Sequence, residues 1–424
     1  MTGYECVIIG GGAAGLAAAA HLPEGWKSLL LEKNSHCGRK LLMTGNGQCN
    51  LTHDGSIRDF LIHYNPEAIN FLKNALFQFT NHDLLNLFRQ QGIDFICTDR
   101  GKYFPSSLRA SDILECLLRI CSKKPGLKIV GSQAVIRIER ADAGFLIHTA
   151  GTVYPASRIL LTGGGLSYPV TGSNGDGCRL AAGLGHTITP LHPGLSPFRI
   201  KKYPFAACAG ISFPMIGIRL YRHQHLVHRQ CGTVLLTHNG LSGPGILHLS
   251  RMARAHDTLS LDFLNDNSPE SFHQKLNEQI RRRGKIILKT YFHEILGFPI
   301  RWLETLEHNP AVGIGSILSF PINQLSRSHR TYLIDMLTGF PMEIQSVGGF
   351  EQAMVTAGGI NLSEVNAKTM ESRIIRNLYL AGEILDIDGD TGGYNLQAAF
   401  STGVLAVRSM IRPVVGCRVN QLPH

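Results

Sequence analysis

The residues best suited to chemistry lie near the start of the chain, where glycines recur at a fixed spacing. Gly10, Gly12 and Gly15 form the pattern G-x-G-x-x-G directly after the apolar residues 6–9. Such glycines allow a sharp turn, let a pyrophosphate approach the backbone, and let a helix pack closely on a strand. Glu32 follows 22 residues after Gly10, where its carboxylate would accept hydrogen bonds from ribose hydroxyls. These residues predict a dinucleotide-binding site.

Such a site needs a strand, a helix and a second strand to position it. Residues 6–9 and 28–31 are short apolar runs, as buried parallel strands are. Residues 16–21 are small and apolar, which favours a helix that Pro23 and Gly25 end. The first N–H groups of this helix would carry the partial positive charge that binds phosphates. The sequence therefore predicts a complete βαβ unit.

The elements that follow indicate which dinucleotide is bound. Two strands joined by a turn at 141–144 precede a strand over 154–161, which ends in Thr162 and Gly163. This return to the main sheet resembles a second flavoprotein signature, in which the strand end packs against the cofactor. The chain has no second G-x-G-x-x-G, so a nicotinamide donor would have to bind transiently, without a Rossmann domain of its own. We therefore expect FAD rather than NAD as the bound cofactor.

Two other segments have the composition of cofactor loops. Residues 33–50 contain Arg39 and Lys40 among glycines and asparagines, with little periodicity. Near the C-terminus, a strand at 377–383 leads into a glycine-rich loop and then a small-residue helix at 395–406. The positive end of that helix would face the N1/O2 edge of a flavin and stabilise its reduced form. Both ends of the chain are thus predicted to meet at one cofactor.

Composition limits the other possibilities. A chain of 424 residues suggests two or three domains, and no apolar run reaches the 18 residues of a membrane span. The N-terminus lacks the basic region of a signal peptide, and its apolar residues belong to the βαβ unit. The ten cysteines are scattered without a C-x-x-C pair, which favours reduced thiols in a cytoplasmic protein.

Histidines and basic residues offer alternatives that we weigh as weaker. His223, His225 and His228 could hold a metal, but they lie in an alternating polar run typical of a solvated strand, so no metal is expected. The net charge of +10 could serve an acidic partner or attract an anionic cofactor and substrate. The basic run 281–289 has no interleaved aromatic residue, so we interpret it as a solvated helix end rather than as a site for a nucleic-acid partner.

Shifts in pattern predict three parts of the chain. Residues 1–190 and 345–424 form the cofactor domain. Residues 191–266 and 341–356 form a β-rich insert, after four prolines between 190 and 204. Residues 267–340 form a helical subdomain, since apolar residues recur there at helical spacing.

At this point the motifs resemble a known family, the bacterial NAD(P)/FAD-dependent oxidoreductases of the BaiN/RdsA type, also described as YhiN-like or aminoacetone-oxidase-like flavoproteins. The similar stretches follow the family order over nearly the whole chain: GGGAAGLAAA at 10–19, GRKLLMTGNGQCN at 38–50, TGGGLSYPVTGSNGDG at 162–177, LAAGLGHTI at 180–188, THNGLSGPGIL at 237–247, VTAGGINLSEVNAKTMES at 355–372 and YLAGEILDIDGDTGGYNLQAAFSTG at 379–403. The resemblance implies an α/β fold with an FAD-binding, glutathione-reductase-like Rossmann domain, a β-barrel-like insert and a helical subdomain.

The resemblance also implies which residues contact the cofactor. The glycine turn (residues 10–15) would hold the pyrophosphate, Glu32 the ribose, and the backbone of Val135 the adenine. The segments around Arg39 and Glu383 would surround the flavin and its ribityl chain. The full set is Gly10, Gly12, Ala13, Ala14, Gly15, Glu32, Lys33, Arg39, Lys40, Leu41, Asn46, Val135, Thr162, Gly163, Gly164, Gly382, Glu383, Asp386, Gly393, Asn395, Leu396 and Gln397.

The function predicted first is an FAD-dependent oxidoreductase that transfers a hydride through flavin N5 to or from a small organic substrate, with NAD(P)H as a candidate transient donor. The sequence does not separate reduction of a C=C bond from oxidation of an amine. One alternative is a flavin-containing RNA-binding or tRNA-modifying factor, and another is a scaffold that keeps FAD without turnover. His238 could donate a proton or simply order its loop, so we assign no catalytic residue.

Overall fold

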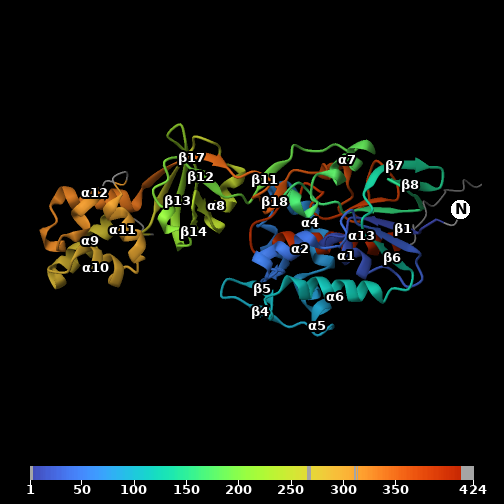
Figure 1. Cartoon of the computed structure of the whole chain (residues 1–424), viewed down its shortest axis with the longest axis horizontal. Coiled ribbons are helices and arrows are strands. Elements are labelled where there is room, and N and C mark those ends of the chain that lie inside the picture. Colours follow the sequence, from blue (N-terminus) through green and yellow to red (C-terminus); the bar gives the residue numbers. More distant parts are fainter. Residues whose placement is uncertain (1–2, 265–268, 310–311, 313, 412–424) are drawn as a thin grey trace, which may run out of the picture. The chain divides into compact units, whose positions relative to one another are not determined.

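The computed structural model describes residues 3–264, 269–309, 312 and 314–411, and the chain divides into two compact units. Unit 1 comprises the residues up to 192 and those from 355 onwards, and unit 2 comprises residues 193–354 (Figure 1). The residues outside this description are 265–266 of the predicted β-rich insert, 267–268, 310–311 and 313 of the predicted helical subdomain, and 1–2 and 412–424 of the predicted cofactor domain.

Unit 1 is built on a five-stranded parallel sheet. Its strand order is β19 (Leu378–Leu380), β10 (Ile159–Leu161), β1 (Cys6–Ile9), β2 (Ser28–Leu31) and β6 (Leu127–Val130). Every residue of the first four strands is buried, as the apolar runs predict. The last residue of β1, Ile9, pairs in register with Leu31 and Leu161. The carboxyl ends of these strands therefore share one edge of the sheet.

The helices that cover this sheet join the two ends of the chain. Helix α1 (Ala13–Ala20) packs against α13 (Tyr394–Ile411) and α6 (Ala110–Ser122), and α4 (Pro66–Gln78) packs against α13. The close approach of α1 and α13 depends on small residues, because a Cβ on Gly403 would overlap the backbone of Ala14. Figure 1 shows these first and last segments side by side within unit 1.

Shorter elements complete unit 1. Those before β10 are α2 (Arg39–Met43), a 3₁₀ turn (Thr44–Gly47), β3 (Thr52–His53), α3 (Ile57–Leu61), α5 (Asn81–Arg89), β4 (Phe95–Cys97), β5 (Lys102–Pro105), β7 (Val135–Ala141), β8 (Gly144–Thr149) and β9 (Val153–Ala156). Those after β10 are a 3₁₀ turn (Pro169–Thr171), α7 (Asp176–Gly183), β18 (Val355–Ala357) and a 3₁₀ turn (Leu362–Glu364). Strands β7, β8 and β9 form the meander that the sequence predicts.

Unit 2 contains a closed β-barrel and a group of helices. The barrel order is β12 (Phe198–Ile200), β15 (Gly240–Ser242), β14 (His225–Leu236), β13 (Ser212–Arg222), β16 (Thr258–Asp262) and β17 (Phe340–Val347). The helices are α8 (Pro244–Leu247), α9 (Pro269–Arg283), α10 (Leu288–Thr290), α11 (Ile300–His308) and α12 (Arg327–Thr338), and β11 (His192–Gly194) leads into the unit. Its core is aromatic, with Trp302 in ring contact with Phe205, Phe213, Phe263 and Phe298.

These observations confirm the predicted fold class, a Rossmann-type α/β domain with a barrel inserted in it. The parallel sheet and glycine turn are those of a Rossmann domain, and the insert between β10 and β19 contains the barrel and its helices. Among the described residues, no helix combines the length and the apolar character needed to cross a membrane.

Candidate functional site

The glycine turn has the shape that a pyrophosphate requires. Gly10 has a φ of +109°, and a Cβ on Gly15 would overlap the carbonyl oxygen of Gly10, so neither position accepts a larger residue without movement. By contrast, a Cβ on Gly12 would meet no atom within 4 Å. Helix α1 starts there without a side-chain cap or an acidic residue in its first turn, so its N–H groups are left for a ligand. This open cradle fits the predicted dinucleotide.

Glu32 lies directly beside this turn. Its Oε2 accepts a hydrogen bond from the Gly11 N–H at 2.8 Å, and its Oε1 accepts two from Asn34, each at 2.8 Å. A carboxylate has about four acceptor positions, so Oε2 retains one for a ribose hydroxyl. The residue is only 8% exposed, which fixes the carboxylate in this position.

The end of β10 is fastened to the glycine turn. The Thr162 hydroxyl lies 3.0 Å from the Ile9 carbonyl oxygen and 2.8 Å from that of Gly10, so it can donate to either. A Cβ on Gly163 would lie 2.8 Å from the Cα of Gly177, so this position needs glycine for close packing on α7. Gly164 follows with a φ of +69°. The strand end therefore shapes the floor of the site.

The segment 38–52 runs from the glycine turn to the start of α13. At one end the Gly38 N–H donates to the Gly11 carbonyl oxygen at 2.9 Å. At the other end, a Cβ on Gly393 would lie 2.6 Å from the Cα of Thr52. Between them, Leu41 is buried and Asn46 is exposed with a φ of +55°. This segment therefore forms a wall along the whole candidate site, as an extended ligand requires.

A charged cluster joins this wall to the other predicted loops. Lys40 forms an ion pair with Glu383, with Nζ and Oε2 2.6 Å apart, and it also hydrogen-bonds the hydroxyl of Ser167. The other carboxylate oxygen of Glu383 accepts from the Ser167 hydroxyl and from the Thr356 N–H, each at 2.8 Å. The Lys40 and Glu383 side chains are 25% and 21% exposed, so the pair is shielded but reachable by a ligand.

At the start of α13, the predicted site residues bond mainly to the protein itself. Asp386 accepts from the Thr189 hydroxyl at 2.8 Å and from the Gly358 N–H at 3.1 Å. The Asn395 amide exchanges hydrogen bonds with both backbone groups of Gly389, at 2.8 and 2.9 Å.

The fully buried Gln397 accepts from the Thr52 hydroxyl at 2.7 Å and donates to the Phe79 carbonyl oxygen at 3.1 Å. These side chains hold the loop and leave its backbone, with half-buried Leu396, to face a ligand. Gly382, with a φ of +78°, brings this region within contact distance of Ala14, since its Cβ would lie 2.8 Å from that of Ala14. Ala13 opens α1 beside it.

The remaining predicted residues lie at the periphery of this arrangement. Lys33 forms an ion pair with Asp176 at 2.6 Å, and burial lowers the pKa of Lys33 although Glu32 opposes the shift. Arg39 is exposed and donates to the Asn34 side-chain oxygen at 3.0 Å. Val135 starts β7, against which α7 packs.

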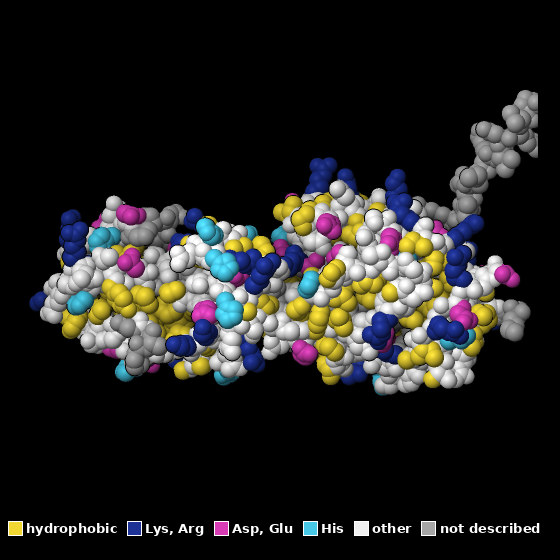
Figure 2. Space-filling model, turned by 90° about the horizontal axis from the view of Figure 1, so that it is seen from above, with side chains coloured by type: hydrophobic (Ala, Val, Ile, Leu, Met, Phe, Trp, Pro, Cys, Tyr) yellow, Lys and Arg dark blue, Asp and Glu magenta, His cyan; other side chains and the backbone are white. Residues whose placement is uncertain are grey.

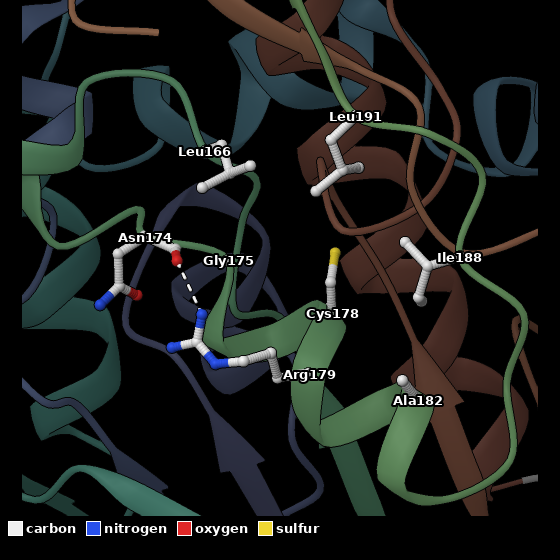
Figure 3. Close-up of a pocket in the computed structure, with 8 residues that line it drawn as sticks. All are labelled: Leu166, Asn174, Gly175, Cys178, Arg179, Ala182, Ile188 and Leu191. Atoms are coloured by element: carbon white, nitrogen blue, oxygen red, sulfur yellow. Dashed lines mark hydrogen bonds between the residues drawn. The ribbon is translucent and has the colours of Figure 1, made fainter.

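A pocket that the sequence does not predict lies beside these loops. It has a volume of about 240 Å³ and is lined by Leu166, Asn174, Gly175, Cys178, Arg179, Ala182, Ile188 and Leu191. Figure 3 shows the Cys178 thiol pointing between the apolar side chains, while Arg179 donates to the Asn174 carbonyl oxygen at 3.1 Å. Burial, assisted by the charge of Glu383, raises the pKa of Cys178 to about 11, so its thiol is protonated at neutral pH. Only the apolar spacing of α7 hints at this pocket in the sequence.

The histidines singled out in the sequence all lie in unit 2. His238 is exposed in the turn between β14 and β15, and His223, His225 and His228 lie on the β13–β14 hairpin. Within the described part of the chain, no group of three or more His, Cys, Asp or Glu residues could hold a metal ion.

Comparison with known proteins gives a match over nearly the whole chain. The family model "HI0933-like protein Rossmann domain" matches residues 4–409. The chain is 32% identical over 411 residues to a 3-dehydro-bile acid delta(4,6)-reductase of Clostridium scindens, covering 95% of this chain and 98% of that protein. It is 30% identical over 415 residues to a ribosomal RNA dihydrouridine synthase of Escherichia coli, covering 97% and 99%. A solved 3-ketosteroid-delta4-(5alpha)-dehydrogenase from Rhodococcus jostii RHA1 is 14% identical, with a TM-score of 0.49 and 97% of each chain covered.

Proposed function

This chain belongs to the HI0933-like Rossmann family and is an FAD-dependent oxidoreductase, and from that premise we propose that it reduces a carbon–carbon double bond conjugated to a carbonyl group. Both relatives described above carry names in which the product has gained hydrogen, as a delta(4,6)-reductase and as a dihydrouridine synthase. The overall reaction would consume the double bond, one NAD(P)H and one proton, and would yield the saturated product and NAD(P)⁺.

The convergence of four cofactor segments at one edge of the sheet in unit 1 carries this proposal. The glycine turn, the end of β10, the segment 38–52 and the start of α13 meet there although they come from both ends of the chain. In open α/β sheets, ligands bind outside the carboxyl ends of the strands. A cofactor of two nucleotide halves would span these segments.

The roles of individual residues follow from this geometry. Gly12 and the N–H groups of α1 would bind the pyrophosphate, and the free acceptor position of Glu32 would bind a ribose hydroxyl. The Lys40–Glu383 pair would orient the ribityl chain, since both side chains remain partly exposed. The backbone at the start of α13 would face the ring.

FAD bound in this way would carry two electrons from the nicotinamide to the substrate. The chain itself orients the reactants and excludes water around them. Next to Glu383, the apolar pocket with the protonated Cys178 would contact the organic part of a small substrate.

A reducing compartment such as the cytoplasm fits the cysteines. Among the described residues, seven cysteines are free and buried: Cys6, Cys37, Cys49, Cys116, Cys121, Cys178 and Cys208. Proteins of oxidising compartments usually pair such residues in disulfides.

Anaerobic spectroscopy of the purified protein tests the proposal. We expect a yellow protein whose flavin absorbance is bleached by NADH or NADPH and restored by a conjugated enone. A protein that stays colourless after incubation with FAD would overturn the cofactor assignment. A yellow protein whose flavin is reduced by a primary amine and is reoxidised by oxygen but not by an enone would overturn the proposed direction.

A second candidate function is reduction of a base in RNA, which the charge of unit 2 favours. Lys and Arg outnumber Asp and Glu in residues 193–354. On the face seen in Figure 2, histidine and basic side chains gather over the barrel. On the β13–β14 hairpin of the barrel, His223, His225 and Arg229 are exposed. This candidate predicts RNA binding that weakens steeply as salt rises, and no binding at low salt would exclude it.

A further inference from the structure

The segment 164–176 runs from just after β10 to the first residue of α7, and it closes on itself. Its two ends lie together, because a Cβ on Gly163 would lie 2.8 Å from the Cα of Gly177. Compact surface loops with adjacent ends are Ω-loops, which frequently serve function. We call residues 164–176 the strap.

The far side of the strap is bonded to the two residues that follow Glu32. The Lys33 ammonium donates to the Asp176 carboxylate at 2.6 Å and to the Asn174 side-chain oxygen at 2.5 Å. The Asn34 side-chain amide donates to the carbonyl oxygen of residue 171 at 3.0 Å. These bonds join the strap, which follows β10, to the segment that follows β2.

The strap has to cross the glycine turn to make these bonds. Strand β1 lies between β10 and β2 in the sheet, and the glycine turn follows its carboxyl end. A Cβ on Gly12 would meet no atom within 4 Å, so the strap leaves the space over this position open. The candidate pyrophosphate site therefore lies beneath a segment that is fastened on both sides of it.

The two fastenings differ in strength. The ends of the strap are held by close backbone packing between Gly163 and Gly177. By contrast, the side chains of Lys33 and Asp176 are 26% and 33% exposed, so water reaches their ion pair. Ion pairs in contact with water are weak and break easily. The strap can therefore open on the Lys33 side while its ends stay in place.

We propose that Lys33 is a latch that holds the strap over bound FAD and thereby sets how fast the cofactor enters and leaves. Lys33 then acts through the strap as a positioning residue, whereas the resemblance implies that it contacts the cofactor directly. Segments that close over a ligand in this way often limit the rate of its release. This assignment rests on the proposed function, since it needs FAD in the site.

The rates of FAD binding test the latch. Lys33→Met keeps a long side chain without its charge, and Asp176→Asn removes the carboxylate that Lys33 shares with Arg179. A weaker latch opens more often in both the empty and the loaded protein. Each variant should therefore speed FAD association and FAD release alike, by about fivefold, and change Kd by less than about twofold. Stopped-flow fluorescence of FAD measures both rates.

A lysine in unit 2 provides the matched control. Lys201 pairs with Glu343 at 2.9 Å in the barrel, and Lys201→Met should change neither rate.

The outcomes separate the latch from the cofactor assignment. If Lys33→Met speeds release but not association, Lys33 contacts FAD directly and the latch is wrong. If neither variant changes either rate, the strap does not limit access and the proposal is also wrong. If the wild type itself does not bind FAD, the cofactor assignment fails and the latch fails with it.

Discussion

The two ends of the candidate cofactor site in unit 1 are built in opposite ways. The glycine turn presents backbone rather than side chains. A Cβ on Gly12 would meet no atom within 4 Å, and α1 begins without a side-chain hydrogen bond to cap it. At the start of α13 the side chains of Asp386, Asn395 and Gln397 are present but bond to the protein. The first end would thus bind its ligand through backbone N–H groups. The second end would bind it through the backbone of a loop that these three side chains hold in place. Substitutions should affect binding at the first end and stability at the second.

The largest effect is expected at the glycine turn. Gly12→Val fills the open space with a branched side chain, so FAD affinity should fall at least about 100-fold, or about 2.7 kcal/mol. The unfolding midpoint of the FAD-free protein should stay unchanged, because the new side chain meets no protein atom. Gly183 in α7 also has open space, and Gly183→Val serves as the control for FAD titration. Normal FAD binding by Gly12→Val would show that the open space at Gly12 is not used by the ligand.

The opposite behaviour is expected of Gln397. Gln397→Ala leaves the Thr52 hydroxyl without its buried acceptor and leaves the Phe79 carbonyl oxygen with the Ser401 hydroxyl alone, so the free energy of unfolding should fall by about 2 kcal/mol. Urea denaturation of the FAD-free protein measures this loss, with the exposed Gln90→Ala as control. A variant that is fully stable but has lost FAD would show that the Gln397 side chain serves the ligand instead.

A smaller effect is expected where the two ends are joined by Lys40 and Glu383. A double-mutant cycle with Lys40→Ala and Glu383→Gln should give a coupling free energy of about 1 kcal/mol, because the pair is only partly shielded from water. Denaturation without FAD measures this coupling. Additive effects of the two substitutions would mean that the Lys40–Glu383 ion pair contributes nothing to the free energy of unfolding.

The smallest effect concerns a support outside the site. The Glu364 carboxylate lies 3.0 Å from His186 Nδ1 and accepts from the Thr187 N–H at 2.9 Å, and the other nitrogen of His186 lies 2.9 Å from the Ser372 hydroxyl. Burial alone would raise the pKa of Glu364, but the bonds from Thr187 and His186 outweigh it and hold the pKa below its ordinary value of 4.5.

The sign of the pH effect follows from this lowered pKa. The stabilisation is present above pH 4.5 and is lost as the pH falls through the lowered pKa of the folded protein. Urea denaturation between pH 5 and about 3 should therefore show a loss of stability that is shallower in Glu364→Gln. An identical pH profile for the variant and the wild type would contradict this role.

Much of the fold could be predicted from the sequence because its signals are local. The apolar runs at 6–9 and 28–31 and the three glycines lie within about thirty residues, so one pattern specifies strand, turn and helix together. Likewise, the strand before Gly382 and the small-residue helix after it are adjacent in the chain. The parallel sheet follows from these pieces without knowledge of side-chain partners.

The finer structure of the candidate site depends on partners that are distant in the sequence. Lys40 and Glu383 are 343 residues apart, and each alone looks like a cofactor contact rather than half of an ion pair. Gln397 reads as a residue facing the flavin, and only the packing of α13 against Phe79 and Thr52 shows where its amide points.

The strand order of unit 1 has a consequence for how the protein is made. Strands β1, β10 and β19 are neighbours in the sheet, yet they end at residues 9, 161 and 380. A ribosome has therefore synthesised all of unit 2 before the last strand of the sheet exists, and domains generally fold as units during synthesis. The barrel can form on the nascent chain. In the nucleotide domain, by contrast, one edge of β10 has no neighbouring strand until β19 emerges. Capture of the cofactor is thereby postponed until β19 and α13 have emerged, and a chain terminated before them would lack the closing helix of the cofactor domain.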